Sequence, residues 1–129
     1  MTYKEKLLEV KRAKEELKEW GKQAFKEGSE QLFKGNPTLE SFGWHEYTPY
    51  WNDGDVCRFC VCNEEPTING ISPYYDNDND QEWDSVLAGK VAEFLCGFDK
   101  DFYETTFGDH VEITVFRDGH TKIDSYQHD

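Results

Sequence analysis

The feature that most constrains this chain is a helical repeat in its N-terminal quarter. Apolar or small residues recur there at intervals of three or four: Val10, Ala13, Leu17, Trp20, Ala24, Gly28 and Leu32. Thr2 and Glu5 have the spacing of a helix-capping box, and turn-forming residues follow at 35–37. We therefore predict one amphipathic helix over residues 2–34.

Such a helix is too long for a domain of this size. At about 1.5 Å per residue it spans roughly 50 Å, whereas a 129-residue domain has a radius of gyration of about 14 Å. Either the helix breaks near Gly21 or Gly28-Ser29, or its first turns protrude and meet a partner. Positions 7, 14, 21 and 28 hold Leu, Lys, Gly and Gly, a poor coiled-coil seam, so we expect a break or kink. The sequence leaves open whether the protein forms a homo-oligomer through this helix.

A first β-hairpin is predicted over residues 42–62. Its turn is Asn52-Asp53-Gly54-Asp55, a strong two-strand connector. Alternation in the returning strand places Phe59 and Val61 on the inward face. Residues 64–75 contain proline and Asn-Gly punctuation and are expected to form a loop.

A second amphipathic helix begins inside the acidic run 76–84. Its apolar stripe comprises Trp83, Val86, Leu87, Val91, Phe94, Leu95 and Phe98. Its other side is small (Ser85, Ala88, Gly89, Ala92 and Cys96), so the first helix is expected to pack there. Residues 99–107 are expected to be a short connection, and 110–117 with 120–126 a second hairpin around Asp118-Gly119.

The order of elements, α-β-β-α-β-β, defines the predicted fold class. It indicates an α+β protein with a single antiparallel sheet of about four strands, in two hairpins, and helices on one side. An aromatic content of 16% suffices for a core. We expect one domain over 1–129, with an N-terminal helix (1–36) and an acidic body (37–129).

Charge is unevenly distributed along the chain. Residues 1–36 carry nine Lys or Arg against seven Glu, whereas residues 37–129 carry five against twenty acidic residues, or −15. Such a body repels nucleic acid and anionic membranes and attracts basic protein surfaces. No apolar run reaches the ~18–20 residues of a membrane span, and the N-terminus has no apolar signal core. We expect a cytoplasmic protein with reduced thiols.

A specific motif occupies the first hairpin, where residues 44–57 read Trp-His-Glu-Tyr-Thr-Pro-Tyr-Trp-Asn-Asp-Gly-Asp-Val-Cys. The segment resembles a recurring motif, W-x-x-Y-T-P-Y-[FW]-N-D-G-D-x-C, of small acidic proteins of tailed phages and bacteria that have no assigned activity. The resemblance covers residues 25–62 well and the last hairpin weakly. It implies a phage origin, and with it the cytoplasm of a host cell, but no chemistry.

The same hairpin offers a candidate ligand pocket. Aromatic faces beside amide and carboxylate groups suit a nucleotide-like small molecule. The candidate residues are Trp44, Tyr47, Tyr50, Trp51, Asn52, Asp53 and Asp55. The alternative is a hairpin whose turn requires Asn-Asp-Gly and whose strands favour aromatic residues.

A second candidate site is acidic and would bind a basic partner. Its residues are Asp76, Asp78, Asp80, Glu82 and Asp84 before the second helix, and Asp99, Asp101 and Glu104 after it. An EF-hand is excluded, because Gln81 and Leu87 stand where that calcium loop needs Gly and a carboxylate. A looser cation site and a merely solvating acidic loop stay open.

Metal and catalytic signatures are weak in the sequence. Strand alternation turns Cys57 away from Cys60 and Cys62, so free thiols are expected, with no structural metal and no cofactor. There is no G-x-S-x-G, H-E-x-x-H or phosphate-binding glycine motif. None of the four His has a neighbour pattern typical of a nucleophile–base pair.

These observations favour a non-enzymatic protein-binding module. Its acidic body would dock on a basic, nucleic-acid-binding protein and act as an inhibitor or nucleic-acid mimic. The alternatives are a small-ligand binder or sponge at the first hairpin, and an enzyme of unrecognised type.

Replacing Asp76, Asp78 and Asp80 together with Asn tests the acidic-mimic hypothesis. A dense cluster keeps its field over the Debye length of about 8 Å at physiological salt, so the triple variant should associate more slowly with a basic partner. Its fold should stay intact. The measurement is association rate against ionic strength for both proteins, and an affinity that is flat with salt or unchanged in the variant would reject the hypothesis.

Overall fold

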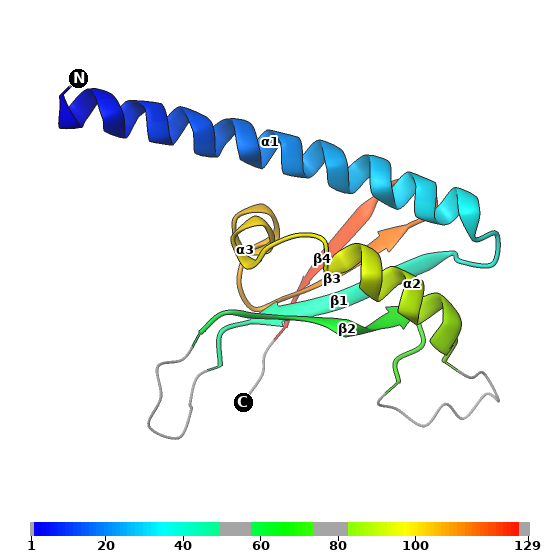
Figure 1. The fold of residues 1–129 in the computed structure, drawn as a ribbon. Coiled ribbons are helices and arrows are strands. Elements are labelled where there is room, and N and C mark those ends of the chain that lie inside the picture. Colours follow the sequence, from blue (N-terminus) through cyan, green and yellow to red (C-terminus); the bar gives the residue numbers. More distant parts are fainter. Residues whose placement is uncertain (1, 50–57, 74–82, 127–129) are drawn as a thin grey trace.

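The described elements form one antiparallel sheet with helices packed on one of its faces (Figure 1). The computed structural model describes residues 2–49, 58–73 and 83–126. In chain order the elements are α1 (Tyr3–Gly35), β1 (Ser41–Tyr47), β2 (Cys60–Ile68), α2 (Ser85–Leu95), α3 (Lys100–Phe107), β3 (Val111–Phe116) and β4 (Thr121–Ser125). The strands lie in the order β2-β1-β3-β4. The α+β class with a single four-stranded sheet is therefore confirmed.

The alternation of β1 separates the two faces of the sheet. Phe42 and Trp44 point toward the helices and contact rings of α1, α2 and α3. His45 and Tyr47 lie on the opposite face, where the His45 ring stacks with that of Tyr126 and the Tyr47 ring lies tilted beside it. No described helix packs over that second face (Figure 1).

The predicted break in the first helix is wrong. α1 is one continuous helix of 33 residues. A capping box begins it: the Glu5 amide donates to the Thr2 hydroxyl (3.2 Å), and the Thr2 amide donates to the Glu5 carboxylate (3.3 Å). Its first turns extend beyond the sheet (Figure 1). Protruding first turns were the alternative to a break in the helix.

The two glycines that suggested a break serve close packing instead. A β-carbon built on Gly28 would lie 2.3 Å from Cε1 of Phe94, and one on Gly21 would lie 2.8 Å from Cδ2 of Phe102. No real β-carbon comes that close to another atom. The hydrogen atom of each glycine therefore lets a ring of the neighbouring layer rest against the helix backbone.

The ring of Phe25 forms the centre of the core. Its centroid lies 5.3 to 5.9 Å from those of five other rings: Phe94, Phe98, Phe107, Trp44 and Phe102. Aromatic pairs at these separations attract one another beyond the gain from burial alone. Since these rings come from β1, α2, α3 and the turn between the two short helices, a single side chain of α1 joins four segments.

The packing between α1 and α2 differs from the prediction. The small side of α2 was expected to face α1, but Gly89 on that side has open space around it, while Phe94 fills the hollow at Gly28. Val86, predicted in the buried stripe, is 69% exposed. The buried residues of α2 are Leu87, Ala88, Val91 and Leu95.

Two further segments differ from their predicted structure. Residues 64–68, predicted as loop, belong to the edge strand β2, whose pairing with β1 is interrupted around Pro66. An edge position tolerates the missing amide of a proline. Residues 99–107, predicted as a connection, contain the helix α3, where the Asp99 carboxylate caps the first turn by accepting from the Phe102 amide (2.8 Å).

The second hairpin is confirmed. β3 and β4 pair in register from Val111 with Ser125 to Val115 with Thr121, and Gly119 in their turn has a φ of +97°. A positive φ of this size strongly favours glycine. The turn predicted at residues 52–55 lies outside the described residues.

Arg117 fixes the C-terminal end of α1 to the sheet. Its guanidinium donates to the carbonyl of Leu39 (3.0 Å) and to that of Asn36 (2.7 Å), and it lies over the ring of Phe33, 5.5 Å from the centroid. The same side chain therefore satisfies carbonyls where α1 ends and covers an aromatic ring.

Gly28→Ala should lower the free energy of unfolding. The added methyl must displace the ring of Phe94, which is held by three other rings, so we expect a loss of about 1–3 kcal/mol. Gly89→Ala is the matched control: it lies in α2 with open space around it and should gain about 0.5–1 kcal/mol. Urea unfolding of both variants checks this, and equal effects would contradict the close contact at Gly28.

Candidate functional site

The acidic candidates are divided by the described structure. Asp84 caps α2 by accepting from the amides of Val86 (3.1 Å) and Leu87 (3.0 Å), just as Asp99 caps α3. Two of the predicted partner-binding carboxylates therefore already stabilise helix N-termini. Asp101 and Glu104 are exposed on α3. Asp76, Asp78, Asp80 and Glu82 lie outside the described residues.

Two residues of the ligand pocket predicted at the first hairpin, Trp44 and Tyr47, are described, and they do not form a pocket together. Trp44 is 2% exposed and lies in the core against Phe25, Tyr103 and Phe107. Tyr47 lies on the opposite face of the sheet, so the two side chains cannot line one pocket. The other candidates, Tyr50, Trp51, Asn52, Asp53 and Asp55, lie outside the described residues.

Glu46 is a buried carboxyl group that the sequence analysis missed. Its side chain is fully buried, and the indole of Trp44 donates to its Oε1 (2.9 Å). Among the described residues nothing hydrogen-bonds to Oε2. Burial is the main reason that the pKa of Glu46 is raised from 4.5 to about 8; it outweighs the lowering effect of the Trp44 hydrogen bond, and the charges of Asp109 and Glu104 add to the rise. Glu46 is therefore mostly protonated at neutral pH.

The protruding half of α1, residues 3–20, carries an unpartnered apolar stripe. The exposed fractions of its large side chains are 84% for Tyr3, 42% for Leu7, 41% for Val10, 68% for Leu17 and 73% for Trp20. All but Trp20 share the helix face that, further along, packs against the body through Gly21, Phe25 and Gly28. The face of α1 that builds the core thus continues along the part of the helix that extends beyond the body (Figure 1), where its large apolar side chains are exposed.

A groove separates α1 from α3 where the protruding half meets the body. It has a volume of about 530 Å³. Leu17, Phe98 and Phe102 supply its apolar surface. Lys14 and Lys18 line the α1 wall, and Asp99 and Asp101 line the α3 wall. Two of the predicted acidic residues therefore face a basic helix of their own chain.

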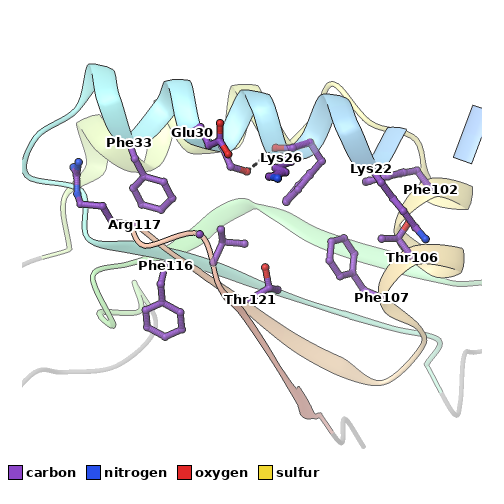
Figure 2. A pocket seen from close by; sticks show the side chains of 14 residues that line it. Lys22, Lys26, Glu30, Phe33, Phe102, Thr106, Phe107, Phe116, Arg117 and Thr121 are labelled. Carbon is purple, nitrogen blue, oxygen red and sulfur yellow. Dashed lines mark hydrogen bonds between the residues drawn. The ribbon is translucent and has the colours of Figure 1, made fainter. Parts of the chain in front are cut away.

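A second hollow, the α1–β4 cleft, lies between α1 and the β3–β4 hairpin and measures about 290 Å³ (Figure 2). Phe25, Phe33, Phe102, Phe107 and Val115 supply its apolar walls. Lys22 and Lys26 reach over it from α1, with Thr106 and Thr121 on the other side. The sequence carried no signal for this cleft, because it depends on the angle between α1 and β4.

Candidate metal ligands do not gather in the part of the chain that the structure describes. No three His, Cys, Asp or Glu side chains there could hold an ion together. Cys60, Cys62 and Cys96 are free thiols. Within the same ranges, no helix combines the length and the apolarity needed to cross a bilayer.

Comparison with known proteins adds no assignment. No family model, no curated protein and no solved structure matches the chain. The resemblance of residues 44–57 to phage proteins therefore stays a prediction, and the function has to be argued from the surface of the molecule.

Glu46→Gln should remove a pH dependence of stability. With a native pKa of about 8 against an ordinary 4.5, the native state keeps a proton that the unfolded state releases between those values. The contribution of Glu46 to wild-type stability should be greatest below pH 4.5, fall as the pH rises to about 8, and level off above it. At about 1.4 kcal/mol for each pKa unit, the total fall is at most about 5 kcal/mol.

Urea unfolding from pH 5 to 9 measures this slope. In Glu46→Gln the free energy of unfolding should no longer fall with rising pH, and at high pH the variant should be more stable than the wild type. Glu93→Gln, which changes an exposed carboxylate on α2, should keep the fall. Parallel curves for Glu46→Gln and wild type would show that Glu46 ionises normally in the folded protein.

Proposed function

We propose that the protein is a protein-binding module whose docking element is the protruding half of α1. The observation that carries this proposal is the exposure of Leu7, Val10 and Leu17 on the face that elsewhere forms the core. Single exposed apolar residues are common, but several along one helix face, here with Lys14 between Val10 and Leu17, mark an interaction surface. An amphipathic helix laid into a groove is a recurring mode of peptide recognition.

The charges beside the stripe define the chemistry of the partner. At 3.6 residues per turn, Lys14 falls within the stripe, and Lys6 and Lys18 flank it. The opposite side of the helix carries Glu5, Glu16 and Glu19, with Arg12 among them. The complementary surface is therefore an apolar groove of another protein with carboxylates along its rim.

The acidic body supports a second, weaker contact. Asp101 and Glu104 are exposed on α3 and are not helix caps, and Asp101 lines the groove between α1 and α3. A basic segment of the same partner would meet them next to the docked helix. The proposal thus retains the attraction of the acidic body to a basic surface. In it, the apolar contact of the docked helix supplies most of the affinity, and the charged contact lies beside it.

Charge substitutions on the stripe test the proposal. Leu7→Asp and Leu17→Asp place a carboxylate against the acidic rim of the partner and should each reduce binding at least tenfold. Both side chains are exposed, so the free energy of unfolding should change by less than about 0.5 kcal/mol. The readout is photo-crosslinking from a benzoylphenylalanine at position 10 in lysate of the source cells, with the products identified by mass spectrometry.

Leu8→Asp is the matched control. Leu8 is 53% exposed in the same turns but points away from the stripe, so its variant should crosslink like the wild type. Crosslinks of the chain only to itself would make the module a homo-oligomer. If Leu7→Asp and Leu17→Asp gave the same crosslinked products in the same yield as the wild type, the proposal would be overturned.

A further inference from the structure

We propose that the α1–β4 cleft binds a small amphiphile with an apolar body and one anionic head group, of the class of medium-chain carboxylates. The proposal concerns a different surface from the docking stripe and does not depend on it. It rests on the shape of the cleft, on the side chains of its walls and on the charges at its opening.

The cleft exists because α1 covers the middle of the sheet but not its β4 edge. Thr121 pairs with Val115 and Ile123 pairs with Ile113, so all four side chains point to the helix side of the sheet. Ile113 and Val115 are buried, whereas Ile123 remains 49% exposed. Of these four residues, Val115 and Thr121 line the cleft, so its sheet side combines a buried apolar side chain with an exposed hydroxyl.

The volume of the cleft limits the size of the ligand. At about 30 Å³ for each water-sized group, 290 Å³ holds roughly ten non-hydrogen atoms. This lies at the small end of ligand sites in proteins. Octanoate, with an eight-carbon chain that includes the carboxylate, has this size, and its chain matches the phenylalanine walls.

The charges at the opening select an anion. Lys22 and Lys26 lie over the cleft, and among the described residues Glu30 is the one acid that lines it, in a chain whose net charge is −13 (Figure 2). Lys22 lies 3.8 Å from Glu19, but Lys26 has no ion pair within the described ranges. Arg117 is committed to backbone carbonyls. Lys26 is therefore the anchor for a head group.

Two hydroxyl groups of the walls are not offered to a head group. Oγ of Thr106 is buried beneath the wall and has no hydrogen-bond partner among the described residues. Ser29, on the opposite wall, already donates its hydroxyl to the carbonyl of Phe25 (2.7 Å). The preference for a carboxylate over an uncharged head group therefore rests on Lys26.

Calorimetric titration of the intact chain with octanoate tests the proposal. We expect one saturable site with a Kd of roughly 0.1–1 mM, a range set by the small number of ligand atoms. Octanol should bind about tenfold more weakly because it lacks the charge, and acetate, which lacks the chain, should not bind. Octyltrimethylammonium has the same chain with the opposite charge and should not compete.

Two pairs of variants locate the site. Lys26→Gln should weaken octanoate about tenfold, whereas Lys11→Gln, on the protruding half of α1, should leave it unchanged. Thr121→Trp fills the cleft from an exposed position and should abolish binding, whereas Lys122→Trp, on the other face of β4, should not. Equal binding of octanoate and octyltrimethylammonium, or full binding by Thr121→Trp, would overturn the proposal, as would the absence of saturation.

Discussion

The close approach of α1 to the layer beneath it determines the rest of the structure. Gly21 and Gly28 remove the side chains that would hold α3 and α2 away, and Phe25 between them enters a cage of rings. Arg117 secures the end of the same helix. Through these contacts α1 and the short helices cover Trp44 and the helix-side face of the sheet. They also leave three surfaces uncovered, which are the protruding half, the groove beside α3 and the cleft beside β4.

Local patterns predicted much of this fold, and they were wrong where tertiary contacts decide. The capping box at Thr2, the end of the helix after residue 34 and the turn at Gly119 depend on neighbours in sequence. A glycine inside a helix costs about 1 kcal/mol by itself, so the sequence favoured a break. The rings that pack against Gly21 and Gly28 belong to Phe102 and Phe94, which lie more than sixty positions further along the chain, so no local pattern contains them. Helix α3 has only two turns, too few for a clear helical period.

The candidate sites were harder to predict than the fold. Trp44 and Tyr47 were grouped because they share a motif, although strand alternation sends residues three apart to opposite faces. The same alternation places Glu46 beside Trp44 in the core, but a glutamate is ordinarily read as a surface residue. The two hollows depend on how α1 diverges from α3 and β4, an angle that is set by the whole core.

The anchored and protruding halves of α1 also differ in how they form. Helix formation is limited by nucleation, since the first turn fixes several residues for a single hydrogen bond, and an isolated segment of eighteen residues is only marginally helical. Residues 21–35 are already held in helical geometry by the core, so they act as a permanent nucleus for the rest of the helix. The protruding half then forms by propagation alone, with the capping box closing its far end. The proposed partner would therefore meet a helix that is already ordered, and little conformational entropy would be lost on docking.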